Sequence, residues 1–393
     1  MESRSRRRLG SRPPRGARRR EDQIADGDGV DRISGLPDDL LLLVLSRFRS
    51  ARDAARTSVL SSRWSDLWRR LPELYFRERI SPSAVEATLA KVAVPKLSVL
   101  DISFYPGSVS SGAIASLLRA AACLDPVELS FGHSVDQKYR DKTIELPGFA
   151  RATKIFLFVH LHLTLPVHSC EFPLLERLYI RWCHIDTGAL ISRCPHLRVL
   201  HTYHCQSYDM LMVHSNTIEE LDISHFGGCI DIVAPELKKF RLNASMHKDF
   251  SMSLSAPMVQ GQSWSCRLDK DHLNLGIDGS WCLSHLELAM KEIGNAAIRL
   301  NIRRPEVDSV LHSRNLTEMF QFPKFSVLEL YLDTSGHVYG ALVLKLLRIC
   351  NGIRRLKLVT NQNVMLLVSA KGNRVPPLAG DYEMTSFQLC KLA

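Results

Sequence analysis

The chain has 393 residues, 45% of them hydrophobic, which is enough for a large core and for more than one structural unit. Its net charge of +10 is concentrated in residues 1–20, where nine arginines and one acid leave only +2 for the remaining residues. A nearly neutral body argues against a nucleic-acid-binding protein, and the absence of any run of 18 apolar residues argues against a transmembrane helix.

Residues 1–30 are rich in arginine, glycine, serine and proline before they turn acidic, and we expect a disordered basic tail. Two interpretations stay open. The tail is either a nuclear import signal or a weak binder of nucleic acid, or it is a solvated segment with no targeting role. No apolar segment follows the arginines, as a secretory signal would require, and the ten cysteines include no CxxC pair. We therefore expect reduced thiols and a location in the nucleus or the cytoplasm.

Three helices are predicted in residues 31–76. The first begins with a proline and two aspartates, which suit the free N–H groups and the dipole of a helix start, and it continues into six apolar residues at 40–45. Shorter helices are predicted at 51–60 and 63–68. A helix that is apolar all round must be buried on every side. A unit of roughly 40–50 residues can cover only one side, so a partner protein is predicted for the other.

The same segment resembles the F-box of plant F-box proteins, in the form DRIS-x-LPD-x-LL…VLS…ARTSVLS-x-RW-x-x-LW-x-x-LP-x-L-x-F. The resemblance implies that residues 33–72 bind a Skp-type adaptor, and through it a cullin scaffold, in an SCF-type ubiquitin ligase. Arg49 and Ser62 depart from the usual pattern, but neither stands at an apolar position. The predicted adaptor-binding residues are Leu36, Pro37, Leu40, Leu41, Val44, Leu45 and Phe48, with Val59, Leu60, Trp64 and Trp68 supporting or completing the surface.

One sequence pattern recurs from residue 95 onward: a proline or polar residue, an apolar residue, two spacer residues, an apolar residue, one spacer residue and an apolar residue. Four consecutive copies centre on Leu178, Leu200, Leu221 and Phe240, at separations of 22, 21 and 19 residues. A period in the low twenties with an L-x-x-L-x-L core is typical of leucine-rich repeats. We predict an α/β fold in which a curved solenoid with a parallel sheet follows the three-helix F-box, and the four residues form one inward column. Unrelated strands are the alternative.

The predicted organisation is a basic tail at 1–30, an F-box at 31–76, a linker at 77–94, leucine-rich repeats at 95–360 and a C-terminal tail at 361–393. Plant F-box proteins commonly carry such repeats after the F-box, and some continue into an FBD segment. Residues 361–393 do not resemble that segment. A truncated or alternative C-terminus is therefore expected.

The target-binding site is predicted on the exposed side of the repeat strands. Neighbours on a strand point to opposite faces, so residues that alternate with the inward leucines face outward. We predict that Tyr179, Arg181, Tyr203 and Arg241 bind an as yet unknown target protein, since aromatic and arginine side chains are favoured binding anchors. The alternative is that these are ordinary solvated positions and that the site lies in the irregular segment 243–282.

Metal and catalytic chemistry find little support in the sequence. Cys183, Cys194 and Cys205 have histidines nearby, but their 11-residue spacing fits the edges of the repeat better than a zinc-ligand knuckle. The phosphate-binding, dinucleotide-binding, hydrolase and zinc-protease motifs are missing. We predict no metal, no cofactor and no enzymatic activity. The expected function is that of a target-recognition adaptor, with a repeat-built interaction scaffold outside any ubiquitin ligase as the alternative.

Overall fold

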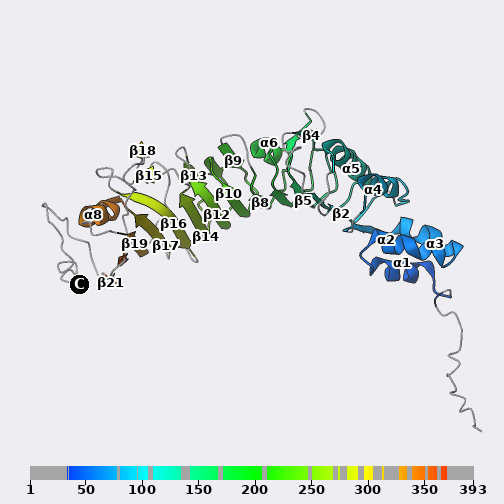
Figure 1. Cartoon of the computed structure of the whole chain (residues 1–393), viewed down its shortest axis with the longest axis horizontal. Coiled ribbons are helices and arrows are strands. Elements are labelled where there is room, and N and C mark those ends of the chain that lie inside the picture. The colour runs from blue at the N-terminus through cyan, green and yellow to red at the C-terminus, as the bar shows by residue number, and fades with distance from the viewer. Residues whose placement is uncertain are drawn as a thin grey trace, which may run out of the picture.

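The computed structural model describes residue 33 and residues 35–369, except residues 78–79, 95, 105–108, 134–141, 167–170, 206–209, 247–249, 269–272, 275–280, 291–295, 304–311, 314–326, 334–338, 350–352 and 361–363. The described residues form a mixed α/β structure, with short helices at the N-terminal end and a large, mostly parallel sheet along the rest of the chain (Figure 1). The expected tail at 1–30 and most of the expected tail at 361–393 lie outside them.

The N-terminal helical unit is a series of short helices and 3-10 turns: α1 (Asp38–Ser46), α2 (Ala51–Arg56), η1 (Thr57–Val59), α3 (Ser62–Leu67) and η2 (Trp68–Arg70). The segment expected as one helix at 51–60 is thus divided between α2 and η1. Ser50 sets the start of α2, because its hydroxyl accepts a hydrogen bond from the backbone N–H of Asp53.

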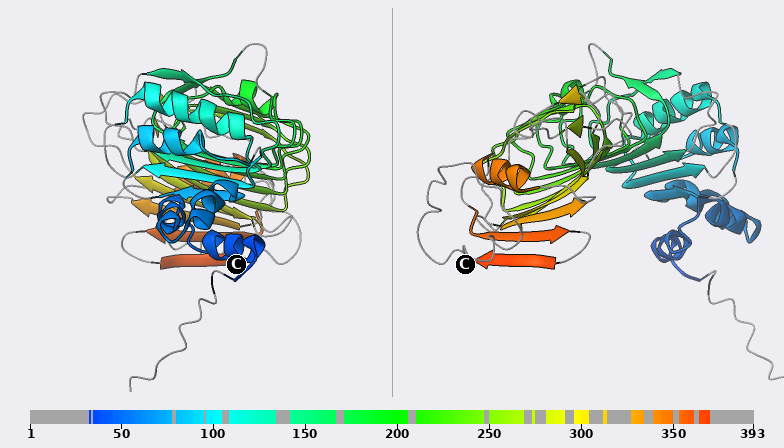
Figure 2. Two further views of the ribbon diagram at one scale, coloured as in Figure 1. Left: turned by 90° about the vertical axis from the view of Figure 1, so that its right-hand side faces the viewer. Right: turned by 60° about the vertical axis from the view of Figure 1, so that its left-hand side comes forward.

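The main sheet runs in the order β1-β2-β3-β5-β7-β8-β10-β12-β14-β16-β17-β19-β20-β21, with β15 paired to β16 and β18 paired to β15. In Figure 2 these strands lie side by side along an arched body. Their bounds are β1 (Glu73–Phe76), β2 (Val99–Phe104), β3 (Glu128–His133), β5 (Lys154–Val159), β7 (Arg177–Arg181), β8 (Val199–Tyr203), β10 (Glu220–Phe226), β12 (Lys239–Met246), β14 (Gly261–Leu268), β15 (Leu273–Asn274), β16 (Cys282–Met290), β17 (Ala296–Arg303), β18 (His312–Ser313), β19 (Val327–Asp333), β20 (Arg355–Thr360) and β21 (Val364–Ser369).

A second layer packs along the main sheet, and its α4, α5 and α6 lie above the strands in Figure 1. Ser81, Ser110 and Asp186 cap these three helices, each accepting a backbone N–H bond through its side chain. The elements of this layer are α4 (Pro82–Leu89), α5 (Ser111–Leu124), α6 (Thr187–Ile191), α8 (Gly340–Ile349), the pair β4 (Thr143–Glu145) and β6 (His162–Thr164), and the small sheet β9 (Met210–His214), β11 (Cys229–Val233) and β13 (Met252–Ser255).

The predicted inward column is confirmed. Leu178 pairs with Leu200, Leu200 with Leu221, and Leu221 with Phe240 in parallel register, and all four side chains are buried. The column also continues toward the N-terminus through Ile155, Leu129, Leu100 and Leu74. Each residue stacks on its neighbour in the next strand, so the leucines that one repeat cannot bury alone are covered by the repeats beside it.

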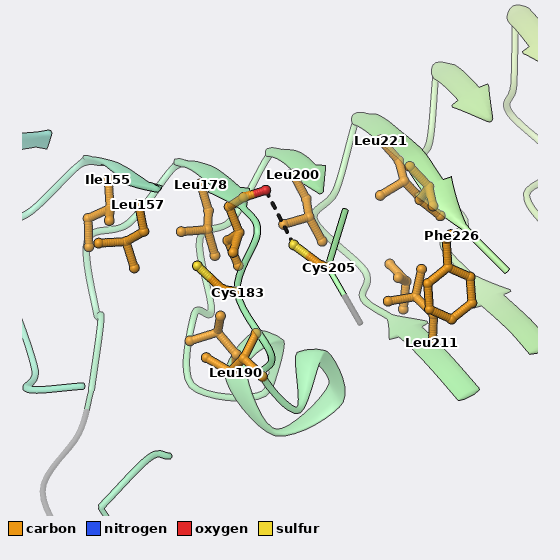
Figure 3. Packing of buried hydrophobic residues seen from close by; sticks show 14 of the residues in the cluster. Ile155, Leu157, Leu178, Cys183, Leu190, Leu200, Cys205, Leu211, Leu221 and Phe226 are labelled. Carbon is orange, nitrogen blue, oxygen red and sulfur yellow. Dashed lines mark hydrogen bonds between the residues drawn. The ribbon is translucent and has the colours of Figure 1, made fainter. Parts of the chain in front are cut away.

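The core between the two layers is closed by α6 and β9 of the second layer. Figure 3 shows Leu178, Leu200 and Leu221 hanging from the strands toward Leu190 of α6 and Leu211 of β9. The thiols of Cys183 and Cys205 lie between them, and Cys205 Sγ donates a weak hydrogen bond of 3.4 Å to the carbonyl of Ile180. The three repeats around α6 therefore share one continuous apolar core.

The sheet is only mostly parallel, which corrects the prediction of uniformly parallel strands. β14 pairs with β16, β16 with β17, and β20 with β21 in antiparallel register. Chain length explains two of these pairs: five residues separate β16 from β17 and three separate β20 from β21. A parallel neighbour needs a crossover of about a dozen residues or more, whereas an antiparallel one needs only a short turn.

The sheet also extends beyond the predicted repeat boundaries of 95 and 360. β1 begins at Glu73 and pairs with β2, α4 occupies the segment expected as a linker, and β21 follows residue 361. The helical unit is joined to this sheet without a break, since the backbone N–H of Ala93 donates to the carbonyl of Arg69 and that of Ser98 to the carbonyl of Pro72. One apolar cluster runs from Leu41 to Leu358.

Candidate functional site

The start of α1 is held against α3 and η2 by two arginines. Arg63 Nε donates to Asp38 Oδ1 at 2.9 Å, and Arg70 Nη1 donates to Asp38 Oδ2 at 3.0 Å. A second nitrogen of Arg63 donates to the carbonyl of Leu36. These contacts hold the start of α1 against α3 and η2, and Arg70 takes part in them although its side chain is exposed.

Asp38→Asn is expected to remove a pH-dependent part of the stability of α1. The hydrogen bond from Arg63, followed by that from Arg70, holds the pKa of Asp38 below its ordinary value of 3.8. A lowered pKa in the folded state stabilises the fold above the ordinary pKa, and this contribution is lost as the pH falls through the lowered value. Amide-exchange protection of α1 should therefore drop between pH 6 and acid pH in the wild type. The drop should be smaller in Asp38→Asn.

Asp39→Asn is the matched control, because Asp39 is an exposed carboxylate in the same turn. This variant should keep the pH dependence of the wild type. Identical pH profiles for Asp38→Asn and the wild type would contradict the role of the arginine contacts.

The structure divides the predicted adaptor-binding residues into an exposed and a buried group. Leu36 is half-buried, and the exposed members are Pro37, Leu40, Val44, Phe48, Val59 and Leu60. The buried members are Leu41, Leu45, Trp64 and Trp68. Leu41 and Leu45, which were predicted as contact residues, are thus buried in this structure. They pack in the core and support the residues that are exposed.

Leu40, Leu43 and Val44 lie on one face of α1, at the three- and four-residue spacing that brings side chains together on a helix. Leu43 was not predicted although its side chain is 58% exposed, and Ile33, just before the helix, is equally exposed. Because every residue at 40–45 is apolar, no polar face marks the solvent side. We call the exposed set Leu40, Leu43, Val44 and Phe48 the α1 face.

Val59 and Leu60 are exposed at the end of η1, outside α1. The structure thus presents two apolar groups on the helical unit. Contiguous exposed apolar side chains on a soluble protein mark interaction sites more often than chance.

Arg49, where the F-box pattern commonly has proline, adopts a left-handed backbone conformation with φ 48°. Its guanidinium donates to Tyr75 Oη at 3.3 Å and lies 4.8 Å from the centre of the Tyr75 ring. The chain therefore turns away from α1 without a proline, and the contact ties the helical unit to β1.

The predicted target-binding residues lie on the face of the main sheet opposite the leucine column, which we call the open face. Tyr179 and Arg241 belong to one row across the strands, in which Tyr179 pairs with His201, His201 with Asp222, and Asp222 with Arg241. Arg181 and Tyr203 are direct neighbours in the next row. With strands about 4.8 Å apart, the three steps from Tyr179 to Arg241 span about 14 Å.

Arg241 and Arg181 differ in their surroundings. Arg241 Nη1 contacts Asp222 Oδ2 at 2.7 Å, so its charge is already balanced by the protein. Arg181 instead lies 4.6 Å from the Tyr203 ring and 5.8 Å from the Phe158 ring. Of the two arginines, Arg181 is the one whose charge is not taken up by a neighbouring carboxylate among the described residues.

In the alternative site at 243–282, residues 247–249, 269–272 and 275–280 lie outside the described residues. Its described strands are β13 in the small sheet and the end of β12, β14 and β15 in the main sheet.

The chain is similar to several proteins of Arabidopsis thaliana. An F-box/LRR-repeat protein is 29% identical over 237 residues, covering 56% of this chain and 49% of the relative. An F-box/FBD/LRR-repeat protein is 27% identical over 245 residues, covering 56% and 54%. F-box/LRR-repeat protein 25 is 26% identical over 238 residues, covering 55% and 86%.

The chain is similar to plant F-box proteins with leucine-rich repeats. It spans about half the length of the first curated relatives that it matches. No family model matches the chain, and no solved structure matches it. The mixed α/β structure with its mostly parallel sheet is compatible with the repeat architecture that the names of these F-box/LRR relatives carry.

The three cysteines considered above as possible zinc ligands are buried. Cys183, Cys194 and Cys205 lie in the core. Burial raises the pKa of the Cys205 thiol to about 11 and also raises that of Cys183. A thiol in such surroundings stays protonated and is a poor metal ligand or nucleophile. Within the described residues, histidine, cysteine and acidic side chains form no group of three that could hold a metal ion.

None of the described helices is both long enough and apolar enough to cross a membrane.

Proposed function

We propose that the chain is the target-recognition subunit of an SCF-type ubiquitin ligase. In this proposal the helical unit is the F-box and binds a Skp-type adaptor, which connects it to a cullin. The main sheet is a leucine-rich-repeat surface that binds the protein to be ubiquitinated. The chain itself would carry out no chemistry, and its relatives carry the names of F-box and F-box/LRR-repeat proteins.

The observation that carries this proposal is the two-sided packing of α1. Leu41 and Leu45 face the core, whereas Leu40, Leu43 and Val44 face solvent, although all five are apolar. A helix that is apolar all round is stable in water only when a partner covers its second side. An F-box that docks on an adaptor provides that partner.

Affinity purification from plant cells with the proteasome inhibited tests the proposal. The chain should recover a Skp-type adaptor and a cullin in comparable amounts. Recovery of a stable target without adaptor or cullin would favour the alternative, a repeat-built interaction scaffold that acts outside a ubiquitin ligase.

Alanine at Tyr179, Arg181, Tyr203 and Arg241 is expected to release the captured target. These side chains lie on the open face, and interface energy is concentrated in a few aromatic and arginine anchors. The adaptor should stay bound, because the four positions lie outside the helical unit. Quantitative mass spectrometry of the purified complexes measures both effects. A target that remains bound to the fourfold variant would move the target-binding surface elsewhere.

A further inference from the structure

Arg181 stands on the open face between two aromatic rings. It pairs in register with Phe158 of β5 and Tyr203 of β8, and its guanidinium carbon lies 5.8 Å and 4.6 Å from the centres of their rings. The side chain is exposed. Among the described residues no carboxylate lies within ion-pair distance of it, so the rings hold the guanidinium in place without neutralising its charge.

Other cations along the same sheet are neutralised by the protein. The paired cations are Arg198 with Glu219 (2.6 Å), Arg241 with Asp222 (2.7 Å) and Arg299 with Glu329 (3.2 Å). Glu219 additionally contacts Lys238 at 2.9 Å. Each of these three arginines therefore has a carboxylate partner on the sheet, whereas Arg181 has none among the described residues.

Three further rings stack beside Arg181 at the strand ends. Trp182 and His204 are 3.9 Å apart with an interplanar angle of 12°, and His204 and His225 are 4.1 Å apart with an angle of 11°. All three residues have left-handed backbone conformations, with φ of 58°, 49° and 59°. Such conformations are strained for a residue other than glycine and tend to occur at functional positions.

The stacked rings are joined to the Arg181 pair through Tyr203, whose ring lies 4.8 Å from both His204 and His225. We call the set Phe158, Arg181, Trp182, Tyr203, His204 and His225 the Arg181 platform. It combines flat aromatic surface with cationic or protonatable groups, and no carboxylate belongs to it.

The charges of the platform act on one another. Burial lowers the pKa of His204, and His225, Arg181 and His160 lower it further, in that order. The nearest carboxylate in the adjoining row, Asp222, is taken up by Arg241 and by the hydroxyl of Ser224. A negative charge supplied from outside would relieve the repulsion that the protein leaves unbalanced.

We propose that the Arg181 platform binds an acidic segment of the captured protein, with an anionic side chain on the Arg181 guanidinium and neighbouring apolar atoms on the rings. The anion is a carboxylate or a phosphoryl group, since a guanidinium binds both through paired N–H bonds. This inference rests on the proposed function only for the source of the segment. The binding chemistry belongs to the platform itself.

The proposal predicts proton-linked binding. A bound anion favours the protonated form of His204, so the affinity should rise as the pH falls from 7.5 to 5.5. The groups that surround His204 are Arg181 from the end of β7, His160 after β5, His225 from β10 and Tyr203 from its own strand. Glutamate keeps its charge over this range, because its ordinary pKa is about 4.3.

The test measures binding of fluorescein-labelled peptides to the purified full chain by fluorescence anisotropy. The peptides alternate glycine with glutamate, phosphoserine or glutamine. The glutamate peptide should bind, and Arg181→Gln should weaken it by about tenfold or more, since a charge-assisted anchor is lost. Arg198→Gln is the matched control and should bind like the wild type, because Glu219 already occupies Arg198. The arginines at 1–20 contribute equally to every variant, and their charge does not change between pH 5.5 and 7.5.

A second pair of variants tests the proton linkage. His204→Gln should flatten the pH dependence of glutamate-peptide binding, whereas His196→Gln, which changes an exposed histidine away from the platform, should leave it unchanged. Comparison of the glutamate and phosphoserine peptides at pH 7.5 shows which anion fits better. Equal losses for Arg181→Gln and Arg198→Gln, no loss for either, or equal binding of the glutamine peptide would overturn the proposal.

Adaptor binding is measured on the same preparations. A chain that binds the glutamate peptide through Arg181 but no Skp-type adaptor would refute the proposed function and leave the anion site standing. A chain that binds the adaptor but loses no peptide affinity in Arg181→Gln would refute the anion site alone.

Discussion

Replacing both Leu43 and Val44 with glutamate is expected to weaken binding of a Skp-type adaptor by at least about 100-fold, because two charges would have to be buried without partners in an interface anchored there. Both side chains are exposed on α1, so the variant should fold like the wild type. Isothermal titration calorimetry with the purified full chain and adaptor measures the loss, and circular dichroism checks the fold.

The matched control is the double variant Leu174→Glu and Met258→Glu. Leu174 is 49% and Met258 54% exposed, so the same charge is added at apolar positions of similar exposure on the repeat body. This control should bind the adaptor like the wild type. Undiminished binding by a folded Leu43→Glu, Val44→Glu variant would show that the α1 face is not the docking surface.

Leu200→Asp is expected to destabilise the repeat body by about 4 kcal/mol or more. The Leu200 side chain is 1% exposed and stacks between Leu178 and Leu221, so an aspartate there would be buried without a partner. For a structure of this size the change should lower the melting temperature by about 6 °C or more, or remove the cooperative transition. Differential scanning calorimetry of the full chain measures it.

Leu174→Asp provides the control for this second prediction, because it makes the same substitution at an exposed leucine just before β7, 26 residues earlier in the chain. Its melting temperature should lie within a few degrees of the wild type. A Leu200→Asp variant as stable as this control would mean that the column of leucines contributes little to the stability of the sheet.

The inward column could be predicted because four consecutive repeats have nearly constant length. Toward the N-terminus, Leu100, Leu129, Ile155 and Leu178 occupy equivalent positions but are 29, 26 and 23 residues apart. The longer repeats contain α5 and the small β4–β6 pair, which break the period. Buried and exposed residues still alternate in those strands. The irregular spacing from one strand to the next is the reason that the N-terminal part of the column could not be predicted.

The direction of the strands and the orientation of α1 could not be read from the same pattern. Alternation looks identical in parallel and antiparallel strands, so the five-residue connection between β16 and β17 was the only clue to a hairpin. In α1 the uniform run at 40–45 predicts burial on all sides but not which side the core takes. That choice is fixed by Asp38, which Arg63 and Arg70 hold from α3 and η2.

Residue type and position on the strand predict all four candidate target-binding residues and place them on one face. These two criteria do not distinguish Arg181 from Arg241. The distinction depends on Asp222, which lies in the neighbouring strand at the register position of Arg241 and pairs with it. Register between strands is set by packing across the whole sheet, so it appears only in the folded structure.

Hydrogen–deuterium exchange of the full chain, with and without a purified Skp-type adaptor, tests the central claim most directly. The adaptor should slow amide exchange in α1 and in the segment around Val59 and Leu60. It should leave amide exchange of β7, β8, β10 and β12 unchanged. Binding that instead protects those strands, or an adaptor at saturating concentration that protects no part of the helical unit, would contradict it.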